Sequence, residues 1–286
     1  MKPNSIGSTE NVDQDIFSKR QSFPWKIYLI ILALALLAAI VKIPAVIFSI
    51  GAADQPQDWM LISVMSALQD LIPFGIFPAV IGLLLANRTG FDLPLIKALL
   101  ARKPLGKLIK NEVVVALISA LILSVVAIIV LLLLKPAVQN DFASQGLSLS
   151  DFEGGSQAPY WAMGLASFSA GILEEIGFRL GLMSLVAFLG GLLWKDAAKR
   201  PASGVIWTTI LLVALLFGAL HISNIAELGL PLTPSLIAYA VIGNFFPSIL
   251  FGWLYWKRGL ETAILTHILF DLCLHVLLPF GMQLFA

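Results

Sequence analysis

Two adjacent glutamates, Glu174 and Glu175, lie in an apolar stretch long enough to cross a membrane, and Arg179 follows four residues after the second. A carboxylate within hydrocarbon costs about 2.5 kcal/mol or more, so ionisable residues there are rare and usually functional. Because residues four apart share one face of a helix, Glu175 can pair with Arg179, which lowers the cost of burying both. Glu174 points away from that pair and is free to face a cavity, where it can take a proton from water. The alternative is that both glutamates only tie helices together.

The three histidines of the chain, His221, His267 and His275, all lie in or beside apolar stretches of its C-terminal half. His267 and Asp271 are four residues apart, so a carboxylate can orient the ring or both groups can bind one metal ion. A glutamate base, two imidazoles and an aspartate can together activate a water molecule and stabilise an oxyanion. Taken singly, each of these residues can instead be a hydrogen-bonded packing residue. Together they predict that Glu174, His221, His267 and Asp271 meet in one cavity.

The composition indicates a protein that crosses the membrane several times. The chain has 286 residues, of which 59% are hydrophobic and 12% charged, whereas soluble domains are about 45–50% apolar and about 25% charged. The net charge of +1 gives no general attraction to nucleic acid. A single cysteine, Cys273, excludes an intrachain disulfide. The sequence has no His-Glu-x-x-His zinc motif, Gly-x-Ser-x-Gly elbow or phosphate-binding glycine loop.

The predicted fold is an all-α, polytopic bundle of about 7–8 transmembrane helices, with the site in a cavity of the C-terminal half. Continuous apolar runs, rather than alternating ones, favour helices over strands. The predicted helices are Trp25–Ile50, Trp59–Ala86, Val113–Leu134, Pro159–Leu180, Val205–Ile222, Leu236–Trp256 and Leu260–Phe280. The short apolar run Met183–Trp194 is either an eighth, broken segment or the end of the fourth helix.

Loop charge predicts the orientation of this bundle in a cell membrane. The loop 88–112 is rich in lysine and arginine, whereas the loop 136–158 carries acidic residues and neither lysine nor arginine. The positive-inside rule then puts the first loop and the N-terminus in the cytoplasm. The basic patches at 195–200 and 257–258 also favour the cytoplasm, which simple alternation does not allow if Met183–Trp194 spans separately.

Three short motifs carry a resemblance to a known family. Glu174-Glu175-x-x-x-Arg179, Phe217-x-x-x-His221 and His267-x-x-x-Asp271 occur in this order on successive apolar segments. In this the chain resembles the CPBP family, the CAAX-protease and bacteriocin-processing enzymes also called the Abi family. The resemblance covers roughly residues 159–280.

The resemblance implies an intramembrane endopeptidase that cleaves a membrane-bound peptide or a lipidated protein, prenylated or bacteriocin-like. It implies that Glu174 and His221 activate water, that His267 and Asp271 complete the oxyanion or metal side, and that Glu175 and Arg179 support the structure. The first four are also the ligands if a divalent metal such as zinc is used; a mechanism without cofactor is the alternative. Relatives that act on prenylated proteins have asparagine where this chain has Asp271. An ionised aspartate cannot donate a hydrogen bond to an oxyanion, so Asp271 favours orienting His267 or binding metal, or it is kept protonated by desolvation.

The chain is therefore divided into a polar cytoplasmic segment (1–24), N-terminal transmembrane helices and loops (25–158), a catalytic helix core (159–280) and a short tail (281–286). We expect partners in the lipid bilayer and not in nucleic acid, and a site that opens laterally or to the cytoplasm. The sequence does not define the oligomeric state.

Two other functions use the same residues. A transporter would relay protons or bind a cation through them, but it predicts related halves, and the polar groups here cluster in the C-terminal half. A non-catalytic immunity or scaffold protein would keep the fold without needing the motif residues.

Overall fold

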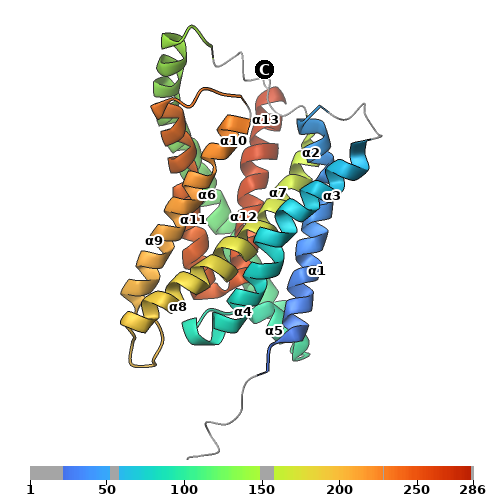
Figure 1. The fold of residues 1–286 in the computed structure, drawn as a ribbon, viewed down its shortest axis with the longest axis vertical. Coiled ribbons are helices and arrows are strands. Elements are labelled where there is room, and N and C mark those ends of the chain that lie inside the picture. Colours follow the sequence, from blue (N-terminus) through green and yellow to red (C-terminus); the bar gives the residue numbers. More distant parts are fainter. Residues whose placement is uncertain (1–21, 52–57, 149–157, 228, 285–286) are drawn as a thin grey trace, which may run out of the picture.

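The computed structural model describes residues 22–51, 58–148, 158–227 and 229–284. Over this part of the chain the regular structure is a bundle of helices (Figure 1), and seven helical stretches are long and apolar enough to cross a membrane. The predicted multi-pass helical bundle is confirmed. Most of the polar N-terminal segment, the acidic residues Asp151 and Glu153 and the last two residues of the predicted tail lie outside the described residues.

The first two spans are each built from more than one helix. Span one joins α1 (Trp25–Val41) to α2 (Ile43–Ser49), with Pro44 in the first turn of the latter. Span two joins α3 (Trp59–Asp70), a π-helical turn η3 (Leu71–Ile76) and α4 (Phe77–Thr89). The breaks follow from proline, which removes a backbone donor and ends or bends a helix.

The third span, α6 (Gly106–Ser144), is much longer than the predicted Val113–Leu134, and a short helix, α5 (Pro94–Leu100), precedes it. Hydropathy detects only the part of a helix that matches the hydrocarbon, about 20 residues. The additional turns at both ends of α6 carry polar residues and were therefore missed.

The remaining spans form the C-terminal half. Span five is α9 (Ser203–Leu220), followed by α10 (Ile222–Glu227), and span six is α11 (Pro234–Arg258). Span seven joins α12 (Leu260–Leu272), the π-helical η6 (Cys273–Leu277) and α13 (Leu278–Leu284). The predicted bounds of these spans agree with the structure to within a few residues.

The fourth span resolves the alternative that the sequence leaves open. It runs without interruption through α7 (Tyr160–Glu174), the π-helical η5 (Glu175–Met183) and α8 (Ser184–Leu193). The apolar run Met183–Trp194 is therefore the end of the fourth helix and not an eighth span. Nothing in the local sequence distinguishes a π-helical turn from an α-helical one, although such turns are frequent at functional sites.

Because the fourth span is a single rod, all the basic loops meet at one end of the bundle (Figure 1). There Asp92 accepts a backbone hydrogen bond from Leu260 at 3.1 Å, and Arg258 pairs with Glu112 at 2.9 Å. The charge conflict that alternation created in the sequence is thereby removed. The described lysines and arginines at this end are Lys26, Arg88, Lys97, Arg102, Lys103, Lys107, Lys110, Lys195, Lys199, Arg200, Lys257 and Arg258.

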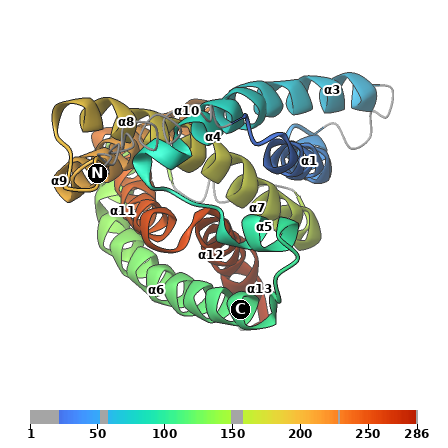
Figure 2. The same cartoon turned by 90° about the horizontal axis from the view of Figure 1, so that it is seen from below.

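Seen along the bundle, α6 runs beside α11 and α12, and α7 lies between α1 and α12 (Figure 2). Two glycines allow the helices that carry the motifs to approach closely. A Cβ on Gly171 of α7 would lie 2.9 Å from the backbone nitrogen of Ile268 in α12. A Cβ on Gly218 of α9 would lie 2.6 Å from the carbonyl oxygen of Val241 in α11. Motif residues on separate helices are thus brought within reach of one another.

Candidate active site

Glu175 and Arg179 form the ion pair that their spacing predicts. Both side chains are completely buried, and Arg179 Nη1 lies 3.2 Å from Glu175 Oε1. Arg179 Nη2 also donates to the backbone oxygen and the hydroxyl of Ser248, at 3.1 and 2.7 Å. Its guanidinium carbon lies 5.0 Å from the ring centre of Phe217 and 5.4 Å from that of Phe251. Cation–π contacts and charged hydrogen bonds therefore offset the burial of this arginine and fix η5 against α9 and α11.

Glu175 also contacts His267, a contact that the sequence analysis missed. His267 Nδ1 lies 2.9 Å from Glu175 Oε1, and because an ionised carboxylate only accepts, the ring nitrogen is the donor. The imidazole is stacked on Phe251, with ring centres 4.5 Å apart and planes inclined by 16°. The ring of His267 is thus fixed on one edge and on one face.

The opposite edge of His267 faces two further carboxylates. Its Nε2 lies 3.8 Å from Glu174 Oε2 and 3.6 Å from Asp271 Oδ2. These separations exceed a direct hydrogen bond and suit a bridging water molecule. The same cluster holds three carboxylates and Arg179, which pairs with Glu175.

The two glutamates differ in their access to solvent. The side chain of Glu174 is 28% exposed, whereas that of Glu175 is 0% exposed. Glu174 lines the cavity described below, and Glu175 does not. Because neighbouring residues on a helix point about 100° apart, the two carboxylates face different directions.

His221 follows the last residue of α9 and closes the second motif. Its Nδ1 lies 2.8 Å from the carbonyl oxygen of Phe217, one turn earlier. Because a carbonyl only accepts, Nδ1 carries the hydrogen and Nε2 is left for the cavity. The ring of Phe217 lies 4.7 Å from that of His221 and 6.2 Å from that of His267, so it separates the two imidazoles.

One cavity of about 320 Å³ brings the four predicted residues together. Its volume is sufficient for several water molecules or for part of an extended peptide. His275, which the sequence placed on the same face as His267 and Asp271, also lines it, and so does Asn244. Asn244 was not predicted as a site residue, because a single asparagine in an apolar helix belongs to no motif. The lining residues are Met163, Ala166, Ser167, Ala170, Glu174, Phe217, His221, Asn244, Pro247, Phe251, His267, Phe270, Asp271 and His275.

A metal site does not form from these side chains as they stand. Among the residues that the structure describes, no three histidine, cysteine, aspartate or glutamate side chains are arranged to hold one metal ion. His267 already uses Nδ1 on Glu175, and its Nε2 is not closer than 3.6 Å to either carboxylate. A bound metal ion therefore stays a prediction from the sequence, and the proposed reaction does not depend on one.

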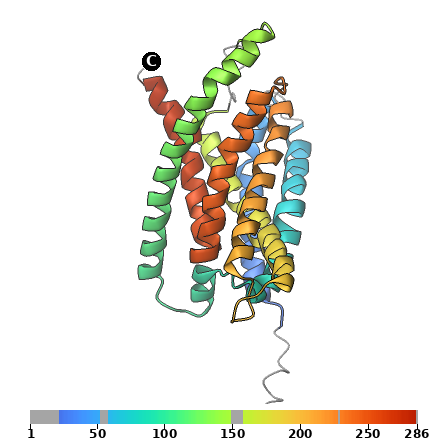
Figure 3. The ribbon, with the colours of Figure 1, turned by 90° about the vertical axis from the view of Figure 1, so that its left-hand side faces the viewer.

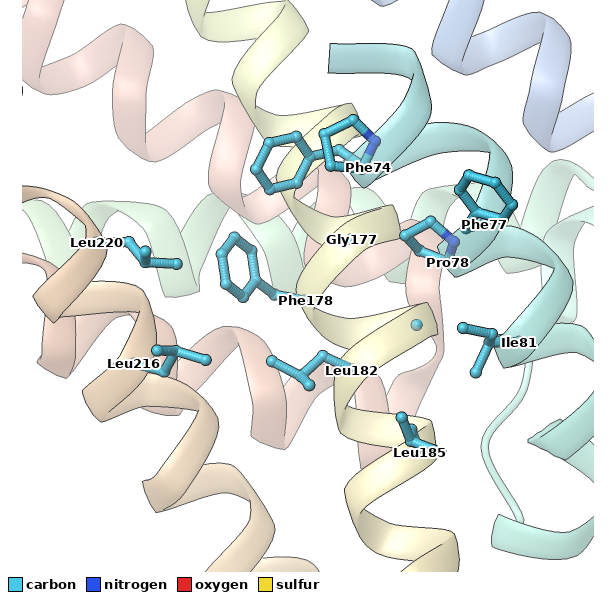
Figure 4. Close-up of a pocket in the computed structure, with 12 residues that line it drawn as sticks. Phe74, Phe77, Pro78, Ile81, Gly177, Phe178, Leu182, Leu185, Leu216 and Leu220 are labelled. Atoms are coloured by element: carbon cyan, nitrogen blue, oxygen red, sulfur yellow. The ribbon is translucent and has the colours of Figure 1, made fainter. Parts of the chain in front are cut away.

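A second hollow, an apolar groove of about 350 Å³, lies on the other side of Phe178 (Figure 4). It lies between α4, the fourth span and α9. Phe178 packs edge-to-face on Phe217, with ring centres 5.0 Å apart, and Phe217 lines the polar cavity. The two hollows are therefore neighbours that share an aromatic wall. The groove is lined by Pro73, Phe74, Phe77, Pro78, Ile81, Gly177, Phe178, Gly181, Leu182, Leu185, Leu216 and Leu220.

Comparison with known proteins agrees with the resemblance predicted from the three motifs. Residues 156–273 match the family model described as type II CAAX prenyl endopeptidase Rce1-like. The matched part contains all three motifs and the helices that carry them, and it confirms the predicted resemblance over these residues. No match was found among curated proteins or among solved structures.

Proposed function

We propose that this protein is an intramembrane endopeptidase that hydrolyses a peptide bond of a membrane-associated substrate. The observation that carries the proposal is the shared cavity: Glu174, His221, His267 and Asp271 come from three spans and line one hollow within the bundle. Groups so costly to bury in a membrane are retained where they act on a ligand or on water. The match of residues 156–273 to an endopeptidase family supports the same reaction.

In the proposed reaction, Glu174 is the general base. A water molecule held between Glu174 and Nε2 of His221 gives one proton to the Glu174 carboxylate, and its oxygen attacks the carbonyl carbon of the peptide bond. The carbonyl oxygen becomes an oxyanion. When the tetrahedral intermediate collapses, the carbon–nitrogen bond breaks and the proton on Glu174 passes to the leaving amine. The products are a carboxylic acid and an amine, and water is the only co-reactant.

His267 supplies the oxyanion side of this site. Its Nε2 points into the cavity, while Nδ1 is held by Glu175. A donor fixed in this way costs little reorganisation when negative charge develops on the substrate. Asp271 orients the same nitrogen and balances its charge, which suits an aspartate better than direct donation to an oxyanion.

Glu175 and Arg179 act as positioning residues. Glu175 joins Arg179 on one side and His267 on the other, so the ion pair fixes the direction of the imidazole. This extends the purely structural role that the sequence analysis gave to Glu175. The hydrocarbon chain of a lipidated substrate is assigned to the apolar groove, because Phe178, which lines the groove, packs directly on Phe217, which lines the cavity.

Purified protein in liposomes tests the proposal when it is given fluorogenic peptides with and without a C-terminal prenylcysteine. We expect a cleaved product, identified by mass spectrometry, from wild-type protein and none from Glu174→Gln. The assay is repeated after treatment with a chelator and after addition of zinc. Loss of cleavage with the chelator and its recovery with zinc would show that the reaction requires a metal ion and would contradict the metal-free mechanism. Equal cleavage by wild-type and Glu174→Gln protein would contradict the proposed base.

A further inference from the structure

The cavity begins at Glu174, Phe251 and His267 and extends from them in one direction along the bundle. Its lining comes from residues 163–174 of α7, 217–221 at the end of α9, 244–251 of α11 and 267–275 of α12 and η6. α7 and α11 begin at the end opposite the basic loops, and α9 and span seven finish there (Figure 1). In the fourth, fifth and seventh spans, the lining residues therefore lie on the side away from the basic loops, and in α11 they lie near the middle of the helix.

The side toward the basic loops is sealed by packed core. Arg179 lies beneath the site between the rings of Phe217 and Phe251 and is fully buried. Below it, Met183 and Tyr255 are 0% exposed, and the Tyr255 hydroxyl lies 3.1 Å from the Ser184 hydroxyl. Water or peptide would have to displace this core to reach Glu174 from the basic end.

The other side becomes progressively more open. Along span seven, His267 is 4% exposed and Asp271 is 9% exposed, whereas His275, two turns beyond His267, is classed as exposed. On α7, Met163, Ala166 and Ala170 lead from the start of the helix to Glu174 and are partly exposed. The burial gradient along span seven, together with the partial exposure of the lining residues on α7, gives the cavity a mouth at the end remote from the basic loops.

At that same end, the last part of α6 forms a structured rim. With 39 residues, α6 is on the order of 60 Å long, about twice the hydrocarbon thickness of a bilayer. It continues beyond the rest of the bundle there (Figure 3). Val138 and Phe142 of this extension pack against Ile225 and Leu236, and Asp141 accepts a 2.5 Å hydrogen bond from the Ser235 hydroxyl.

The distribution of charged residues indicates on which side of the membrane this end of the bundle lies. The basic loops gather at the opposite end, and the end with the mouth carries Asp58 and Asp141, with Lys135 in the last part of α6. Lys42, near the end of α1, is paired with Asp70. Lysine and arginine in short loops are retained in the cytoplasm, so the mouth faces away from it.

We propose that the active cavity is reached from the non-cytoplasmic side of the membrane, and that the substrate is a peptide segment exposed on, or entering the bilayer from, that side. The inference rests on the proposed function and differs from the expectation of a site open laterally or to the cytoplasm. A prenylated tail held at the cytoplasmic face would not reach Glu174, because the packed core below Arg179 lies between them.

Thiol labelling in intact cells and in inverted membrane vesicles tests the direction of access. In a Cys273→Ser background, Ala166→Cys reports on the cavity, while Ser144→Cys and Lys103→Cys report on the two ends of the bundle. With a positively charged, membrane-impermeant methanethiosulfonate, we expect Ala166→Cys and Ser144→Cys to react in intact cells and Lys103→Cys to react only in inverted vesicles. Labelling of Ala166→Cys only from the Lys103 side, or from neither side, would overturn the proposal.

Labelling requires no turnover, so the same pattern is expected when Glu174→Gln is added. Correct labelling without any peptide cleavage would therefore reject the proposed function and leave the direction of access standing. In a second measurement, the side on which Ser144→Cys reacts shows which end of the protein faces outward, and liposomes are sorted by this orientation. A charged, impermeant peptide is then added outside. Cleavage is expected only where the Ser144 end faces outward, and cleavage only in the opposite orientation would overturn the proposal.

Discussion

Two neighbouring carboxylates, one residue apart, occupy different surroundings. Glu175 belongs to a closed cluster in which Arg179, His267 and Ser248 join three helices, and its side chain has no exposure. Glu174 faces the cavity, and its Oε2 lies 3.8 Å from His267 Nε2. The difference is that partners stabilise the buried charge of Glu175, whereas Glu174 has the access to a cavity that the proposed reaction requires. The variants below separate these two regions.

The largest effect on folding is expected from Arg179→Ala. This change leaves Glu175 buried without its cation, and breaking a buried pair from one side costs about 3–5 kcal/mol. Thermal unfolding in detergent should show a much lower midpoint or poor expression. Arg179→Lys is the matched control. It should rescue only partly, because lysine lacks the planar group that both donates to Ser248 and stacks on two rings. A wild-type midpoint for Arg179→Ala would mean that the closed cluster does not hold the fold.

His267 belongs to both regions, so its variants should affect both properties. His267→Ala removes the donor to Glu175, which costs about 1–3 kcal/mol for an unsatisfied buried acceptor. It should also lower the cleavage rate by about 10²–10⁴-fold, the usual contribution of a positioned acid or base. His221→Ala is the comparison, because the hydrogen bond of His221 is to the backbone carbonyl of Phe217 and not to a buried carboxylate. It should lower the rate with a smaller change in the unfolding midpoint, and equal destabilisation by both would contradict this division.

Gly171→Ala tests the close approach that brings the two regions together. The added methyl group would meet the backbone of Ile268, next to His267. Overpacking of this kind costs about 1–3 kcal/mol, and α7 must shift away from α12. We expect a moderately lower midpoint and a reduced cleavage rate. Gly106→Ala, whose Cβ would meet open space, is the matched control and should be near wild type.

The smallest effect is expected in the apolar groove. Leu216 lines the groove and not the polar cavity, so Leu216→Trp is expected to fill the groove and to leave the residues of the cavity in place. Cleavage of a prenylated peptide should fall severalfold through a higher KM, whereas cleavage of the unlipidated peptide should be unchanged. If both peptides lose activity equally, the groove does not bind the substrate's lipid chain.

Sequence reasoning predicted the spans well because hydropathy reports directly on contact with hydrocarbon. It predicted the Glu175–Arg179 pair because that pair is local, four residues apart on one helix. It did not predict the bond between Glu175 and His267, which joins residues 92 positions apart. That bond depends on how α7 and α12 cross and on a π-helical turn that the local sequence does not encode. The sequence analysis expected a site open laterally or to the cytoplasm, whereas the access from the other side that we propose is argued from the packing of the core, which the sequence alone does not display.

The most direct test of the account compares Glu174→Gln with Glu175→Gln in one preparation, by cleavage rate and by thermal unfolding. Both changes remove one charge and keep the shape of the side chain. The account predicts that Glu174→Gln loses cleavage by about 10²-fold or more and keeps the wild-type unfolding midpoint. Glu175→Gln should lower the midpoint because Arg179 loses its counter-charge. A Glu174→Gln protein that cleaves at the wild-type rate would contradict the central claim.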